Sequence, residues 1–179
     1  MCMRDGISIA AGVLALTLGF AGIAARAESP NLGRDATPEE IAAWDISIDP
    51  SGAGLPAGSG TAHQGATIFA QKCAACHGEN ATGKPNDALV GGQGTLATDK
   101  PVKTVGSYWP YATTLFDYIR RAMPLPQSKS LAPDEVYALA AFILAQNKII
   151  GDDDVMDATT LPQVKMPNRD GFVRFERAK

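Results

Sequence analysis

The chain has 179 residues, of which 45% are hydrophobic and 20% are charged, so it can bury the core of one domain. Its net charge of −3 argues against nucleic acid as a partner, because no basic excess exists to neutralise phosphates. Three cysteines are too few for a disulfide framework, and two of them lie three positions apart. The sulfur is therefore expected to serve chemistry rather than cross-linking.

The first 27 residues are expected to be a cleaved signal peptide. Arg4 precedes an apolar run over residues 7–25, and Ala25-Arg26-Ala27 has the small-x-small pattern of a cleavage site. The alternative is a membrane anchor, because about twenty apolar residues can span a bilayer. The cleavage site favours export. No other stretch is long and apolar enough to span a membrane, so the mature chain is expected in the periplasm without a membrane span.

The remaining chain is predicted to hold one helical domain between two extensions. Residues 28–60 form an N-terminal extension with a short helix beginning at Pro38, and residues 151–179 form an extended C-terminal tail. Within the domain, residues 61–150, helices are predicted over 62–76, from about 113 to Pro124, and from Pro133 to just before Gly151. Residues 78–111 are irregular, and no segment indicates a strand.

The motif Cys73-Ala-Ala-Cys76-His77 carries the chemistry, because Cys-x-x-Cys-His is the attachment signature of covalent haem. Two thiols at this spacing can reach the two vinyl groups of one porphyrin, and the adjacent imidazole then faces the iron. The motif occurs once, so a single haem c is predicted. The haem also provides a core for the irregular loop.

Two other uses of the motif are less well supported. A thioredoxin-like redox pair needs a βαβ context, which the pattern lacks. A structural zinc site needs a fourth ligand, and His63 is the only other histidine.

Met123 is the predicted sixth iron ligand. It precedes Pro124 at a helix exit, which lets the chain return to the opposite haem face, whereas Met156 and Met166 lie in the tail. Met166, His63 and an open site remain alternatives. A histidine–methionine pair closes both faces of the iron and makes the protein an electron carrier rather than an enzyme. An open face would instead indicate gas binding or peroxide chemistry.

The arrangement of these motifs resembles the class I cytochromes c. The resemblance is carried by Gly65 and Phe69, by the Cys73–Gly78 motif, by Met123-Pro124, and by a following helix with Tyr137 and Phe142. It implies an all-α fold, with helices and long loops wrapped around one haem. In this family a proline carbonyl after the motif accepts a hydrogen bond from the ligand histidine, and Pro85 fits that position.

A narrower resemblance covers nearly the whole mature chain. The run Lys103–Pro124 and Met166-Pro-Asn-Arg-Asp-Gly-Phe are similar to the cytochrome subunits of periplasmic molybdenum sulfite and sulfur dehydrogenases. This similarity implies electron transfer from sulfite oxidation to a downstream cytochrome or oxidase. Another periplasmic dehydrogenase or oxidase remains an alternative partner.

Two aromatic residues are candidates for contact with the haem, and a group of lysines is a candidate for contact with a partner protein. Tyr108 and Trp109 are candidates for propionate contacts, or they simply bury their rings. Residues 72–129 hold seven basic and four acidic side chains. Five lysines there either ring the haem edge and steer an acidic partner, or are ordinary solvated side chains: Lys72, Lys84, Lys100, Lys103 and Lys129.

Overall fold

The computed structural model describes residues 32–173, so the predicted signal peptide lies outside the described residues. The chain divides into two units, residues 1–37 and residues 38–179. Among residues 32–173, the helices and 3-10 turns before the last long helix are α1 (Pro38–Trp44), α2 (Ala62–Lys72), α3 (Ala74–His77), η1 (Glu79–Ala81), α4 (Ala112–Ala122) and η2 (Leu125–Gln127). The others are α5 (Pro133–Gln146), η3 (Leu161–Gln163), and strands β1 (Ser59–Thr61) and β2 (Val155–Asp157). Within the described range, no helix is long and apolar enough to cross a membrane.

Helix α2 begins at a capping box, as its sequence allows. The Thr61 hydroxyl accepts a hydrogen bond from the Gln64 N–H, and the Gln64 side chain accepts one from the Thr61 N–H. The sequence predicted one helix over residues 62–76. The structure instead ends α2 at Lys72, because Cys73 leaves helical geometry, and α3 continues as a separate turn.

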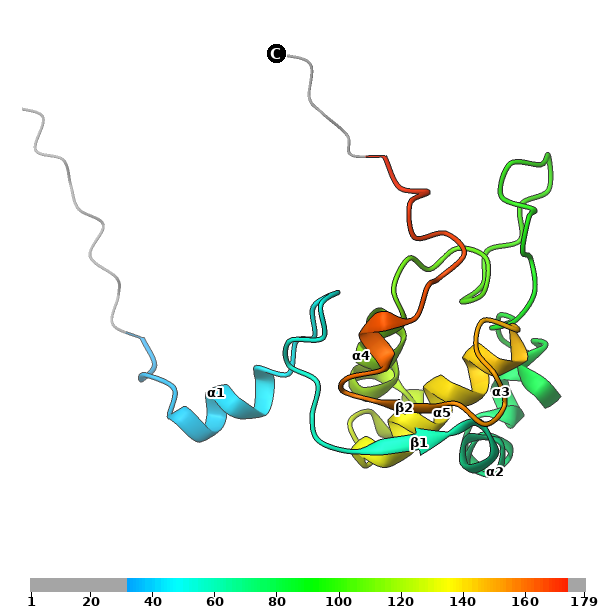
Figure 1. The fold of residues 1–179 in the computed structure, drawn as a ribbon. Coiled ribbons are helices and arrows are strands. Elements are labelled where there is room, and N and C mark those ends of the chain that lie inside the picture. The colour runs from blue at the N-terminus through cyan, green and yellow to red at the C-terminus, as the bar shows by residue number, and fades with distance from the viewer. Residues whose placement is uncertain (1–31, 174–179) are drawn as a thin grey trace, which may run out of the picture. The chain divides into compact units, whose positions relative to one another are not determined.

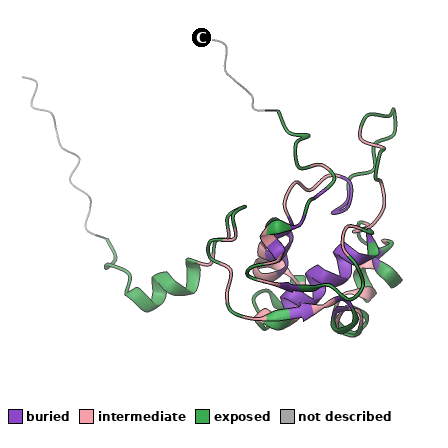
Figure 2. Ribbon diagram, in the orientation of Figure 1, coloured by how far each residue is buried: buried purple, intermediate pink, exposed green. Residues whose placement is uncertain are grey.

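Helix α5 lies at the centre of the domain and is buried on every side. Each residue from Val136 to Ala145 is buried, whereas the periodicity predicted a single apolar stripe (Figure 2). Two aromatic contacts fasten the neighbouring helices to it: Phe69 against Phe142 at 4.9 Å between ring centroids, and Phe116 against Tyr137 at 4.4 Å. The predicted helix ran almost to Gly151. It ends at Gln146, because Asn147 caps it and Lys148 takes a positive φ of 59°.

The backbones of α2 and α5 are in direct contact at Gly65. A Cβ atom placed on Gly65 would lie 1.9 Å from the Ala138 carbonyl oxygen, so only glycine fits this crossing. Gly60, just before α2, approaches the same helix, and its Cβ would lie 2.2 Å from the Ala138 nitrogen. The contact fixes how α2 and the α3 turn after it lie against α5 (Figure 1).

A short antiparallel sheet joins the two ends of the domain. Gly60 in β1 pairs with Met156 in β2, which lies in the predicted tail (Figure 1). The sequence indicated no strand, because three residues are too few to show a period of two. The tail also buries Leu161, Val164 and Met166, so residues 155–166 lie on the domain and contribute side chains to its core.

Replacing Gly65 with alanine is expected to destabilise the protein, although alanine favours helix by about 1 kcal/mol elsewhere. The added methyl group meets the backbone of α5, so overpacking costs of about 1–3 kcal/mol should outweigh the gain in propensity. Urea unfolding of Gly65→Ala measures this. Exposed Thr67 on the same helix provides the matched control, since Thr67→Ala should be neutral or slightly stabilising. A Gly65→Ala variant as stable as wild type would contradict the close contact.

Candidate haem site

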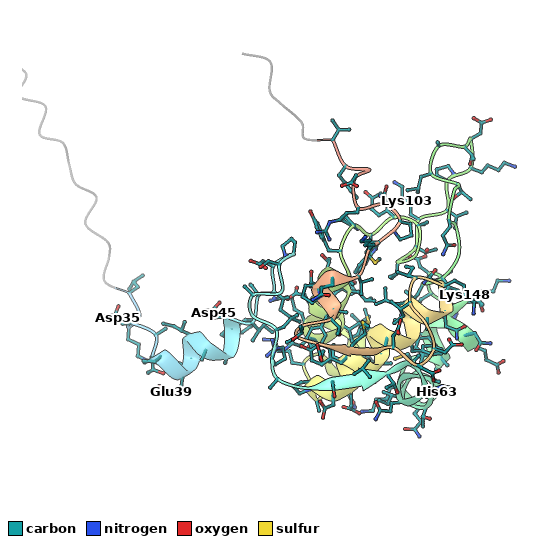
Figure 3. The ribbon with its side chains drawn as sticks, in the orientation of Figure 1. Asp35, Glu39, Asp45, His63, Lys103 and Lys148 are labelled. Atoms are coloured by element: carbon teal, nitrogen blue, oxygen red, sulfur yellow. The ribbon has the colours of Figure 1, made fainter. Side chains whose placement is uncertain are left out.

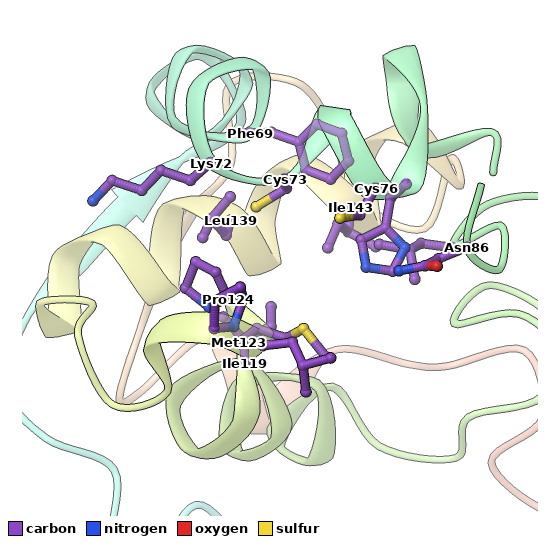
Figure 4. A pocket seen from close by; sticks show the side chains of 14 residues that line it. Phe69, Lys72, Cys73, Cys76, Asn86, Ile119, Met123, Pro124, Leu139 and Ile143 are labelled. Atoms are coloured by element: carbon purple, nitrogen blue, oxygen red, sulfur yellow. The ribbon is translucent and has the colours of Figure 1, made fainter. Parts of the chain in front are cut away.

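A pocket of about 290 Å³ lies between the α2–α3 segment, the end of α4 and one side of α5 (Figure 4). Its lining is mostly apolar and includes four groups that can bind haem or iron. The full lining is Phe69, Lys72, Cys73, Cys76, His77, Asn86, Leu89, Ile119, Met123, Pro124, Leu125, Pro126, Leu139 and Ile143. Flat apolar walls with a few convergent ligating groups are what a porphyrin requires.

One side of the pocket carries the Cys-x-x-Cys-His motif. The Cys73 carbonyl accepts hydrogen bonds from the N–H groups of Cys76, at 3.1 Å, and of His77, at 3.0 Å. This single turn brings both thiols and the imidazole to the same pocket. Gly78 follows with φ of 73°, and a Cβ there would lie 2.2 Å from the Gly83 carbonyl oxygen, so the chain bends sharply after the histidine.

The two thiols have different surroundings. Burial raises the pKa of the Cys73 thiol to about 11, with a smaller lowering by Lys72 and a raising by Cys76. Cys73 is therefore protonated at neutral pH and packs against the core, whereas Cys76 is exposed. Within residues 32–173, no group of three or more His, Cys, Asp or Glu side chains is placed to hold a metal ion.

The hydrogen-bond acceptor of His77 differs from the prediction. The sequence assigned the Pro85 carbonyl, but the carbonyl that lies 3.0 Å from His77 Nδ1 belongs to Asp87. The reason lies in the intervening turn. The Asn86 N–H donates to the Cys76 carbonyl at 2.8 Å, which draws the chain back to the motif, and the Asn86 carbonyl accepts the Lys84 N–H, so the carbonyl of the following residue, Asp87, is the one that reaches Nδ1.

Met123 lies across the pocket from the cysteines (Figure 4). It is the C-cap residue of α4, where the chain leaves helical geometry at φ of −116°. The other candidate ligands lie elsewhere. Met156 and Met166 are buried in the core at 4% and 3% exposure, and His63 lies at the surface beside Asp153 (Figure 3). Among the predicted sixth ligands, Met123 alone lines the same pocket as His77.

Tyr108 and Trp109 do not line this pocket. Tyr108 packs against Phe172, and Trp109 packs edge-on against Tyr118 at 5.6 Å. Their contact with propionates stays a prediction. Of the five lysines proposed to ring the haem edge, only Lys72 lines the pocket. The ammonium of Lys103 lies over the Tyr108 ring (Figure 3), and that of Lys129 over the Trp44 ring.

An ion pair joins α2 and α5 at the edge of the pocket. Lys72 Nζ lies 2.5 Å from Glu135 Oε1, and Glu135 Oε2 accepts the Ala132 N–H at 3.0 Å. The hydrogen bond from Lys72 is the largest cause that lowers the pKa of Glu135, followed by the bond from Ala132. Glu135 therefore caps α5 and holds Lys72 beside Cys73 at the same time.

The sequence reasoning missed much of the pocket wall. Leu139 and Ile143 face the pocket from α5, and Ile119 faces it from α4. All three are apolar residues of helices, and nothing in one sequence separates an apolar residue that faces a cofactor from one that faces the core. Asn86 and Leu89 also line the pocket, and their segment shows no period that would indicate it.

Comparison with known proteins agrees with this geometry. Residues 60–143 match the family model described as cytochrome c oxidase, cbb3-type, subunit III. A chain in the crystal structure of the sulfane dehydrogenase SoxCD from Paracoccus pantotrophus is 45% identical, with 83% of this chain and 74% of that chain covered and a TM-score of 0.77.

Two other structures match more weakly. One is the thiosulfate dehydrogenase TsdBA from Marichromatium purpuratum, at 26% identity and a TM-score of 0.37, covering 48% of this chain and 18% of that chain. The other is cytochrome cL from Hyphomicrobium denitrificans, at 22% identity and a TM-score of 0.33, covering 83% of this chain and 77% of that chain. The search of curated proteins gave no significant match.

The chain belongs to the cytochrome c family, and its fold is that of the class I cytochromes. It is an electron-transfer protein rather than an enzyme. Covalently bound haem c is the cofactor of this family.

Replacing Glu135 with glutamine is expected to cost about 0.2–1 kcal/mol at neutral pH, because the charge pair with Lys72 is partly exposed. The folded-state pKa of Glu135 lies below its ordinary value of 4.5, so the stabilisation is present above pH 4.5 and is lost as pH falls through the lower value. Urea unfolding at several pH values tests this. Wild type and Glu135→Gln should differ at pH 7 and converge in acid, while Glu79→Gln, at an exposed position, should match wild type throughout. A pH-independent difference would assign the effect to packing instead.

Proposed function

We propose that this chain is a periplasmic mono-haem c-type cytochrome that accepts electrons from a molybdenum dehydrogenase acting on sulfite or a related sulfur compound. It then passes them to a downstream cytochrome or oxidase of the respiratory chain. One observation carries the haem assignment: both thiols, His77 and Met123 line a single apolar pocket. Export with cleavage near Ala27 supplies the compartment in which such haems are attached.

The residues of the pocket fit one haem c. Cys73 and Cys76 provide two thiols for thioether attachment, and Phe69, Leu139 and Ile143 provide apolar walls. The donors are an imidazole and a thioether, the pair found in electron-carrying cytochromes c. When bound, the haem supplies an iron that takes up and releases one electron.

The chain's own side chains define what that centre does. His77 and Met123, which line the same pocket, would hold the iron. The His77 Nδ1–H donates to the Asp87 carbonyl, which fixes the ring orientation and raises its basicity. The soft sulfur of Met123 would raise the reduction potential, and with both ligands in place the haem would supply electron transfer and leave no position for a substrate.

The identity of the partner rests on similarity over most of the chain. At 45% identity to a chain of a sulfane dehydrogenase, the mature sequence supports a donor of the same chemical class, an enzyme that oxidises sulfur compounds. Two segments, residues 103–124 and 166–172, resemble the cytochromes of sulfite dehydrogenases, and this resemblance also supports a sulfur-oxidising donor. The haem pocket itself contains no group that selects sulfur chemistry, so another periplasmic dehydrogenase is the second candidate.

Replacing Met123 with alanine is expected to leave the haem covalently attached but open one face of the iron. Carbon monoxide should then bind to the reduced variant and not to wild type, and the weak red absorption band of a methionine–iron bond should disappear. Met156→Leu and Met166→Leu are the controls, because both methionines are buried away from the pocket and should leave spectrum and reactivity unchanged. Carbon monoxide binding to wild type would favour the ligand-binding alternative.

Rapid reduction of the matured wild-type protein is expected when sulfite and a molybdenum sulfite dehydrogenase are both present. Stopped-flow absorbance follows the haem, and omission of either sulfite or enzyme should abolish the reaction. A second assay replaces the sulfite enzyme with a periplasmic dehydrogenase for an organic substrate. Fast reduction only in the second assay would overturn the sulfur partner while leaving the electron-carrier assignment intact.

A further inference from the structure

Asn147, at the carboxyl end of α5, makes a dense set of buried hydrogen bonds that the electron-carrier assignment does not require. The residue is 5% exposed. Its Nδ2 donates to the carbonyls of Leu89, at 3.1 Å, and Ile143, at 2.9 Å. Its Oδ1 accepts from the Gly91 N–H at 3.0 Å and from Gln93 Nε2 at 3.2 Å. Both donors and both acceptor sites of the amide are therefore used.

No other side chain satisfies this site equally well. Aspartate keeps the acceptors but loses the donors to Leu89 and Ile143, and leucine leaves the Leu89 carbonyl and the Gly91 N–H without their partner. The site also has no spare room, because a Cβ on Gly106 would lie 1.9 Å from Asn147 Oδ1. The Gln93 side chain also donates to the backbone carbonyl of Asn147 at 3.0 Å, so Gln93 is bonded to both the side chain and the backbone of Asn147.

The loop held by Asn147 is the one that supplies the acceptor of His77. Its near end is fixed by the bond from the Asn86 N–H to the Cys76 carbonyl, at 2.8 Å. Asp87 follows directly, with its carbonyl 3.0 Å from His77 Nδ1. The far end, Leu89 to Gly91, is fixed by Asn147. The Asp87 carbonyl thus lies between an anchor on the haem motif and a far end that Asn147 ties to α5. The Leu89 N–H also donates to the Ala81 carbonyl at 2.9 Å, and the Thr104 hydroxyl donates to the Gly91 carbonyl at 2.6 Å, so Asn147 shares this anchoring.

We propose that Asn147 is a positioning residue for His77: by pinning residues 89–91 to the end of α5, it keeps the Asp87 carbonyl aligned with the imidazole Nδ1–H. The inference rests on the proposed function, in that His77 binds the iron. A well-aligned acceptor makes the imidazole more basic, and a more basic ligand stabilises the oxidised iron. Loosening the loop should therefore weaken this bond and raise the reduction potential.

The test compares matured wild type with Asn147→Ala by equilibrium redox titration. We expect the reduction equilibrium constant to rise roughly threefold, which is about 30 mV at 59 mV per tenfold change. In the reduced protein, the nuclear magnetic resonance signal of the His77 Nδ1 proton should move upfield and exchange faster with solvent, as expected for a weaker hydrogen bond. Leu161→Ala is the control for general destabilisation, because Leu161 is fully buried in η3, outside the haem pocket, and should leave both readouts unchanged.

A milder pair of variants covers the case in which Asn147→Ala does not fold. Asn147→Asp keeps the acceptors, removes the donors to Leu89 and Ile143 and adds a negative charge, and Gln146→Glu adds the same charge at an exposed neighbouring position. The potential of Asn147→Asp should lie above that of Gln146→Glu. Any of three results would overturn the role of Asn147. The two variants of this pair could have equal reduction potentials, a folded Asn147→Ala variant could keep the wild-type potential, or Leu161→Ala could shift the potential by the same amount as Asn147→Ala. A wild-type protein without covalent haem would instead overturn the proposed function.

Discussion

The direct contact between the backbones of α2 and α5 at Gly65 is the constraint on which the haem site depends. Because no side chain separates the helices there, the α3 turn that follows α2 is held close to α5. That turn carries Cys76 and His77, while α5 supplies Leu139 and Ile143 to the facing wall. A small shift at the crossing would therefore change the width of the pocket, since packed helices move as units.

Helix α5 acts on the site at both of its ends. At its start, Glu135 pairs with Lys72 beside the first attachment cysteine. At its end, Asn147 holds the loop whose carbonyl faces His77. Between them the helix is buried on all sides, which explains why its position is well defined even though most of the loop after the motif has no regular structure. Polar contacts at the two ends of α5 thus fix the positions of Lys72 and of residues 89–91, which hydrophobic packing alone does not determine.

The residues that meet in the pocket were easier to find from the sequence than the residues around them. The motif at residues 73–77 is local, and the position of Met123 at a helix exit is visible from Pro124, so both could be read directly. The acceptor of His77 could not, because a backbone carbonyl has no residue signature and the turn through Asn86 decides which carbonyl reaches the ring. The role of Asn147 depends on contacts more than fifty positions away along the chain, and periodicity shows no such contacts. The sheet was not predicted for a related reason, since the pairing of Gly60 with Met156 is set by the folded core rather than by strand-forming segments.

The β1–β2 pairing has a mechanical consequence for the domain. Ser59, where the chain enters the sheet, pairs with Asp157, where it leaves, so tension applied to the two flanking segments meets at one residue pair. Antiparallel strands loaded at the same end separate one rung at a time, and each rung yields before the load reaches the next. The segment that follows Asp157 is itself anchored in the core by Leu161, Val164 and Met166, so a pull from the C-terminal side would have to extract these side chains before the ladder opens.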